Sequence, residues 1–144
     1  LEGGDENVGR SIMRWNQTAQ CMRCHAVFEW GGDVGPNLAA IGAKYDKREL
    51  LESVIDPSAK IAMGYGVATL TLNNDEVVGG IVEAEDATSI TLKLGKSESR
   101  TISKMDIKER IDAVSSMPSI KDKLSKRQIR DLVAYLTTLK GHEG

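Results

Sequence analysis

The pattern of apolar and polar positions divides the chain into helical and strand-like segments. A first helix is predicted over 5–15, because Asp5 can cap it and apolar residues follow at helical spacing. Gly9 lies inside this helix, where glycine costs up to about 1 kcal/mol relative to alanine, so we expect another helix to pass close to it. The apolar positions are Val8, Ile12 and Trp15.

Two further helices are predicted from their start signals and from single apolar stripes. Over 46–56, Asp46 and Glu49 form a start that resembles a capping box. A second capping box, Ser125 with Gln128, begins the last helix. The stripes consist of Leu50, Leu51, Val54 and Ile55 in the earlier helix and Ile129, Leu132, Val133, Leu136 and Leu139, flanked by Tyr135, in the later one.

Between these two helices the apolar period changes to two. Ile90, Leu92 and Leu94 alternate with polar residues, which is typical of a strand with one buried face. We therefore expect an antiparallel module of four or five strands over about 66–112, inserted between the second helix and the loop before the last one. The expected strands begin at Val67 and continue over Val77–Ala84, Ser89–Leu94, Thr101–Met105 and Ile107–Ile111.

The composition of the chain gives no support for a protein that binds nucleic acid or for one that binds or spans a membrane. The net charge of −2 gives no electrostatic reason to expect binding to nucleic acid or to an anionic membrane. No apolar run reaches the length of a transmembrane helix. The chain opens without an initiator methionine, a basic start or an apolar stretch, so we expect a processed chain or an excised domain. Only 4% of residues are aromatic, which would suit a core partly filled by a large flat cofactor.

The most specific chemistry lies in the stretch Cys21-Met22-Arg23-Cys24-His25. Two thiols three residues apart, followed by a histidine, form the attachment signature of a c-type haem. Residues i and i+3 share one face of a helical turn, so Cys21 and Cys24 can reach the two vinyl groups along one porphyrin edge. His25 then comes under the iron as a ligand. We therefore predict one covalent haem c.

Three other interpretations of the two cysteines are weaker. A thioredoxin-type redox pair needs a βαβ setting, which is absent around residue 21. A structural zinc site needs four ligands, and this chain has two cysteines and two histidines, of which His142 lies near the end. A disulfide between Cys21 and Cys24 would close almost no loop.

The segment after the attachment stretch, 31–38, holds three glycines and one proline and is expected to be irregular. A ligating histidine needs its second ring nitrogen held by an acceptor, which fixes the ring. The carbonyl of Pro36 is the simplest candidate for this acceptor. A surface loop with turn residues only is the alternative.

Met117 is the predicted second axial ligand. It precedes Pro118, so it lies in extended chain from which a thioether can project. Met63, before Gly64, is the main competitor. The other candidates are Met13, expected in a helix, Met22, within the attachment turn, Met105, expected in a strand, and His142, in the tail.

Together these residues resemble class I cytochrome c, and more specifically the haem-binding domain family found at the C-terminal end of large, exported, multidomain bacterial proteins. The resemblance covers nearly the whole chain. It is carried by Cys21, Cys24 and His25, by Val34-Gly35-Pro36-Asn37-Leu38, by Asp56-Pro57-Ser58 and Gly64-Tyr65, and by Ser116-Met117-Pro118 and Asp131-Leu132-Val133-Ala134-Tyr135-Leu136.

The resemblance implies a mainly α cytochrome c-like fold with an inserted small antiparallel β module, α+β overall, in a single domain over 1–144. It implies thioether bonds at Cys21 and Cys24, axial ligation by His25 and Met117, and a hydrogen bond from His25 to the Pro36 carbonyl. It also implies that Gly9 meets the last helix near Tyr135.

Electron transfer is the first functional hypothesis, because histidine and methionine fill both axial positions. The protein would not be an enzyme itself but would relay electrons from a fused or partner dehydrogenase. The alternative is a gas or redox sensor, or a peroxidase-like domain, with a labile sixth ligand. Covalent haem attachment takes place outside the bacterial cytoplasm, so a periplasmic or otherwise exported location is expected.

Two surfaces bear on partners. The β module is either a docking or dimerisation surface or a filler that shields one side of the haem. Five basic residues after Met117 either steer an acidic redox partner or form a solvated helix face. They are Lys121, Lys123, Lys126, Arg127 and Arg130.

Overall fold

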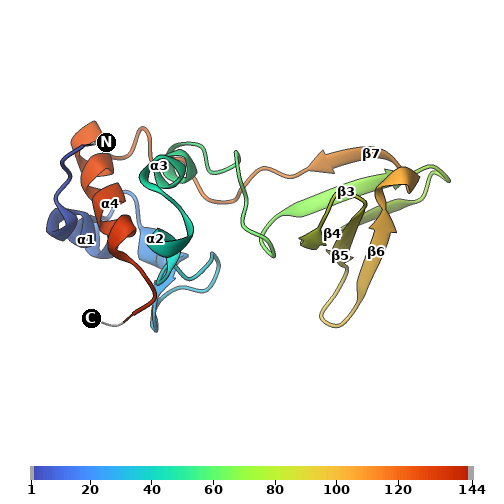
Figure 1. Cartoon of the computed structure of the whole chain (residues 1–144), viewed down its shortest axis with the longest axis horizontal. Helices are drawn as coiled ribbons and strands as arrows, with labels where there is room; N and C mark the ends of the chain where they lie inside the picture. Colours follow the sequence, from blue (N-terminus) through green and yellow to red (C-terminus); the bar gives the residue numbers. More distant parts are fainter. Residues whose placement is uncertain (1, 143–144) are drawn as a thin grey trace. The chain divides into compact units, whose positions relative to one another are not determined.

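The structure is a computed structural model that describes residues 2–142 (Figure 1). The chain forms two compact units, each with its own hydrophobic core. The helical unit consists of the described parts of Leu1–Lys60 and Met117–Gly144, and the β unit consists of Ile61–Ser116.

The expected fold class was wrong. The structure is 30% helical and 25% strand, with four helices in the described residues, and is not a mainly α cytochrome c fold. The physical reason is that the helices are short and separated by long loops, while the segment with period two forms a five-stranded sheet with its own core. The β unit therefore contributes about as much regular secondary structure to the chain as the helical unit does.

The helical unit contains α1 (Glu6–Trp15), α2 (Ile41–Lys44), α3 (Lys47–Ile55) and α4 (Lys126–Thr138). The three predicted helices are confirmed, with N-caps at Asp5, Asp46 and Ser125 and complete capping boxes at the start of α3 and α4. The helical turn expected at the two cysteines is present as the short 3-10 turn η1 (Cys21–Arg23). The sequence did not predict α2 or the hairpin of β1 (Ala26–Val27) and β2 (Trp30–Gly31).

Helix α4 is the centre of this unit, because α1, α2 and α3 all contact it. Gly9 of α1 faces it at very short range: a Cβ atom at Gly9 would overlap the Asp131 carbonyl and lie 2.8 Å from Tyr135 Cβ. The predicted close approach at Gly9 is thus confirmed. The buried carboxylate of Asp131 also accepts a hydrogen bond from the Asp5 N–H at 2.9 Å, which ties the start of α1 to α4.

The buried face of α1 differs from the predicted stripe. Gly9, Ile12 and Met13 are buried, whereas Val8 and Trp15 are exposed. The close packing of Gly9 on α4 rotates the helix so that the residues three and four positions later, Ile12 and Met13, enter the core. Trp15 therefore points to solvent.

The β unit is an antiparallel sheet with the strand order β6-β5-β4-β3-β7. Its strands are β3 (Val67–Leu72), β4 (Val77–Glu85), β5 (Ser89–Lys93), β6 (Ser99–Ser103) and β7 (Ile107–Asp112). The predicted strands are confirmed within a few residues, except that Met105 lies in the 3-10 turn η2 (Lys104–Asp106) and is exposed. This turn leads from one edge strand, β6, to the other, β7.

The inward face of the sheet is fully buried although no second layer of the β unit covers it. Leu70, Ile90 and Leu92 have no solvent exposure, as the alternation predicted for Ile90 and Leu92. The sheet must therefore curl around its own inner face, which the right-handed strand twist favours. The core consists of Ala68, Leu70, Leu72, Val78, Val82, Ile90, Leu92 and Ile102.

Ion pairs close the curled sheet between strands that are not neighbours. Arg110 of β7 donates to both carboxylate oxygens of Glu85 at the end of β4, at 2.8 and 3.0 Å, and Lys104 lies 2.8 Å from the same group. Hydrogen bonds from Arg110 and Lys104 lower the pKa of Glu85 to about 2.

Among residues 2–142, no helix has both the length and the apolar character needed to cross a lipid bilayer.

The lowered pKa of Glu85 predicts that the β unit loses stability in acid. The folded pKa of Glu85, about 2, lies below its ordinary value of 4.5, so the stabilisation is complete above pH 4.5 and is lost as the pH falls from about 4.5 to about 2. We expect a loss of about 1 kcal/mol over this window, since the pair is partly exposed. Urea unfolding of the sheet across this pH range measures it.

Glu85→Gln should remove this part of the pH dependence and cost about 1 kcal/mol at neutral pH. Glu98→Gln is the matched control, because it removes an exposed carboxylate outside the network. Equal pH profiles for the wild type and Glu85→Gln would contradict the assignment.

Candidate haem-attachment site

The two cysteines and the histidine lie on one tight turn. Gln20 has a left-handed backbone (φ 49°), and η1 follows directly. The backbone N–H groups of Cys24 and His25 both donate to the Cys21 carbonyl, at 3.2 and 3.0 Å. Both thiols are free and partly buried, and burial raises the pKa of the Cys21 thiol. The turn thus presents two thiols and one imidazole together.

The glycine-rich loop braces this turn through its backbone. Gly32 N–H donates to the carbonyls of Met22 and His25, at 3.0 and 3.1 Å, and Gly35 N–H donates to the Cys24 carbonyl at 2.8 Å. A Cβ atom at Gly32 would collide with the Arg23 carbonyl, so a side chain there would break the contact. Residues 32–38 lack regular structure, as expected, whereas Gly31 belongs to β2. The loop is tied to the turn at several points.

The predicted hydrogen bond between His25 and Pro36 is present. His25 Nδ1 lies 2.8 Å from the Pro36 carbonyl oxygen, and because a carbonyl only accepts, Nδ1 carries the proton. Nε2 is then the nitrogen with a free lone pair. Gly35 lies against the ring: a Cβ atom there would be 2.7 Å from His25 Cε1 and 2.9 Å from Nδ1. Sequence analysis missed this contact, because it depends on how the loop folds against the ring.

Met117 belongs to the helical unit and packs, partly buried, against the same core as Cys21. Its segment is fastened to the end of α3, because Ser119 Oγ donates to the Ile55 carbonyl and Ile120 N–H donates to the Val54 carbonyl. Among the other candidates, Met13 is 2% exposed in the core, whereas Met63 and Met105 belong to the β unit and are exposed. His142 is exposed near the end of the described chain.

These donors are chemically suited to a haem. Two thiols can form thioethers, and one imidazole nitrogen is free to bind iron while the other is held. Beyond the attachment turn, seven partly buried apolar side chains pack against the same core. They are Phe28, Leu38, Ile41, Tyr45, Leu51, Ile55 and Met117. Within residues 2–142 no three His, Cys, Asp or Glu side chains gather where they could hold a metal ion together.

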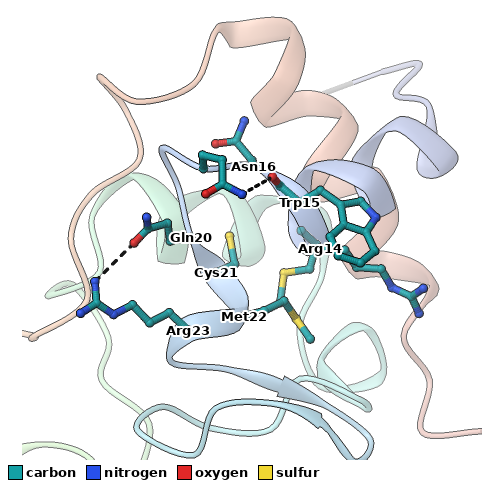
Figure 2. Close-up of a pocket in the computed structure, with 9 residues that line it drawn as sticks. Arg14, Trp15, Asn16, Gln20, Cys21, Met22 and Arg23 are labelled. Carbon is teal, nitrogen blue, oxygen red and sulfur yellow. Dashed lines mark hydrogen bonds between the residues drawn. The ribbon is translucent and has the colours of Figure 1, made fainter.

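A recess of about 380 Å³ opens beside the turn (Figure 2). It borders on Cys21 but does not include His25 or Met117, so it adjoins the candidate site without containing the two predicted iron ligands. The recess lies between the end of α1 and η1. Its lining consists of Met13, Arg14, Trp15, Asn16, Gln17, Gln20, Cys21, Met22 and Arg23.

Comparisons with models of known protein families and with curated proteins give no match for this chain. The function is therefore argued from the geometry of the site. The site consists of the turn, the backbone hydrogen bonds that brace it and the imidazole that the Pro36 carbonyl orients.

Proposed function

We propose that the protein is an electron-transfer protein that carries one c-type haem, held by thioethers to Cys21 and Cys24 and by His25 as an axial ligand. When bound, the haem supplies a reversible one-electron change between Fe(III) and Fe(II). Cys21, Cys24 and His25 would hold it, and the Pro36 carbonyl would orient the His25 ring. The observation that carries the proposal is the hydrogen bond of His25 Nδ1 to Pro36, on a turn that presents both thiols.

The hydrogen bond from His25 to the Pro36 carbonyl supports the proposal because a histidine that binds a metal needs such an acceptor at its second nitrogen. A ligating histidine is fixed in ring orientation and made more basic when its second nitrogen donates to an acceptor. The contact with Gly35 restricts the ring further. A histidine with only a packing role would not need both restraints on a turn flanked by two thiols.

Met117 is the proposed second axial ligand. Two hydrogen bonds from the residues just after it fasten its segment to α3, and its side chain is partly buried at the core that Cys21 also contacts. A coordinatively filled iron favours electron transfer over ligand binding. The same proposal includes an exported location, since covalent haem attachment takes place outside the cytoplasm, and a redox partner or fused dehydrogenase as electron donor.

The β7 edge of the sheet gives little support to a homo-oligomer formed by edge pairing. The edge strand β7 carries Lys108, Glu109, Arg110 and Asp112, and charged residues on an edge strand discourage pairing with another chain. We therefore propose that the electron-transfer partner, and not a second copy, is the main binding partner.

The test uses the protein matured in a cell that attaches c-type haem. We expect the mass of one covalently bound haem, and in the oxidised protein the weak far-red band of methionine-ligated Fe(III). Met117→Leu should abolish that band and allow carbon monoxide to bind, because the sixth position opens. Absorption spectra measure both effects.

Met63→Leu is the matched control. It should leave the far-red band and the mass added by the haem unchanged, since Met63 is an exposed residue of the β unit. A mature chain without added mass would refute haem attachment. A wild-type protein that has the haem but lacks the band and binds carbon monoxide would instead favour the sensor or peroxidase-like alternative.

A further inference from the structure

The recess at the end of α1 combines an exposed aromatic side chain with uncompensated positive charge. Trp15, at its rim, is 73% exposed, although tryptophan is usually largely buried. The only other tryptophan, Trp30 on the adjacent hairpin, is 76% exposed. Exposed tryptophans are uncommon on a free surface and are enriched at the centre of protein–protein interfaces.

The charge of the recess has one sign. Its nine lining residues include Arg14 and Arg23 and no carboxylate; the other polar members are the neutral amides of Asn16, Gln17 and Gln20. Within residues 2–142, neither arginine side chain pairs with a carboxylate. The Arg23 guanidinium donates to Gln20 Oε1 at 3.4 Å, a hydrogen bond that Figure 2 marks with a dashed line. The overall net charge is −2, so this local positive charge stands out against the rest of the molecule.

The recess also reaches the attachment turn. Cys21 and Met22 line it, and the Met22 methyl group extends towards Gly31, where a Cβ atom would lie 3.0 Å from it. Met22 therefore links the recess at Trp15 to the hairpin that carries Trp30. A molecule seated in the recess lies next to residues that flank the proposed haem.

We propose that this recess docks an acidic segment of the protein that exchanges electrons with this chain. Carboxylates of the partner pair with Arg14 and Arg23, and an apolar side chain packs on Trp15 and Met22. The inference rests on the proposed function for the identity of the partner as a redox protein. Charge complementarity argues for an acidic occupant, and the exposed indole argues for a protein surface over a small anion.

The test is an NMR titration of the reduced protein, residues 1–144, with a short synthetic peptide rich in glutamate that contains one leucine. The Trp15 indole N–H signal, assigned through Trp15→Phe, is expected to shift on binding. Arg14→Gln and Arg23→Gln should each weaken binding about fivefold, and binding should weaken as salt is added. A peptide with glutamine in place of glutamate should not bind.

Arg127→Gln is the matched control, because it removes the same charge from an exposed position on α4, outside the recess. It should change the affinity less than about twofold. If Arg127→Gln weakens binding and Arg14→Gln does not, the acidic peptide binds the basic face of α4 and the inference is overturned. An unshifted Trp15 signal at saturating peptide overturns it too.

A second measurement links docking to electron transfer. Oxidation of the reduced protein by hexacyanoferrate(III), an anionic reagent, should slow about threefold in the double variant Arg14→Gln/Arg23→Gln and remain unchanged in Arg127→Gln. The indole readout does not depend on the haem, so a chain without haem that still binds the peptide refutes the proposed function alone. A haem-bearing chain whose Trp15 does not respond refutes only this inference.

Discussion

Replacing Gly9 with valine is expected to destabilise the helical unit by about 3 kcal/mol, at the upper end of what overpacking costs. The added side chain would occupy the space of the Asp131 carbonyl and approach Tyr135 Cβ, both on α4. A backbone carbonyl cannot rotate away as a side chain end can, so the two helices must separate. That separation exposes Ile12 and Met13 and lengthens the hydrogen bond from Asp5 to Asp131.

Gly79→Val is the matched control in the β unit. The nearest atom to a Cβ at Gly79 is 3.7 Å away, and valine favours strands, so this variant should be neutral or more stable. Urea unfolding followed by amide NMR signals separates the two units. In Gly9→Val the β-unit signals should persist, because its core shares no residue with the core of the helical unit. A Gly9→Val protein that unfolds like the wild type would contradict the close packing of α1 on α4.

The helices were predictable where the signal is local. Asp46 with Glu49 and Ser125 with Gln128 cap their helices by bonds within four residues, so the sequence alone contains the partners. The buried face of α1 was not predictable in this way, because Val8 and Trp15 are apolar residues like Ile12 and Met13 and offer an equally good stripe. Gly9 contained the missing signal, because the face that meets another helix closely must include the small residue.

The fold class and the short elements depend on contacts between distant residues. Period two marks the strands but does not show that β7 returns beside β3 and that the sheet curls over its own core. The hairpin of β1 and β2 needs a positive φ at Phe28, and the Asn37 amide, nine residues later, donates to the Phe28 carbonyl. Nothing in the local sequence indicates such a bond.

The turn of the candidate site was predictable because its two cysteines and its histidine lie within five consecutive residues. The acceptor for His25 was predictable in kind, since a ligand histidine needs one and the loop after it is short. The steric role of Gly35 was not, because it depends on the fold of the loop against the ring. The recess at Arg14 and Trp15 was missed because Trp15 was assigned to the core.

Replacing Gly35 with valine is expected to displace the His25 ring and break its hydrogen bond to Pro36. A Cβ atom at this position would lie 2.7 Å from His25 Cε1, and the ring cannot move away and stay 2.8 Å from the Pro36 carbonyl. Loss of such an outer hydrogen bond typically weakens a metal ligand 10–100-fold. Added imidazole first takes the position proposed for Met117, so the measurement must follow His25 itself. We therefore expect the ring-proton NMR signals of His25 to leave their iron-bound positions at about 10–100-fold lower imidazole concentration than in the wild type.

Gly35→Ala should give the same effect to a smaller degree, because its single methyl group can be accommodated by a smaller rotation of the ring. Gly95→Val is the matched control, since a Cβ atom at Gly95 meets nothing within 4 Å. Urea unfolding of the helical unit separates ligand displacement from loss of the fold: in Gly35→Ala the free energy of unfolding should change less than the imidazole affinity does. Equal imidazole titrations for wild type, Gly35→Ala and Gly35→Val would mean that the ring position does not govern ligation, and the role assigned to His25 would then be wrong.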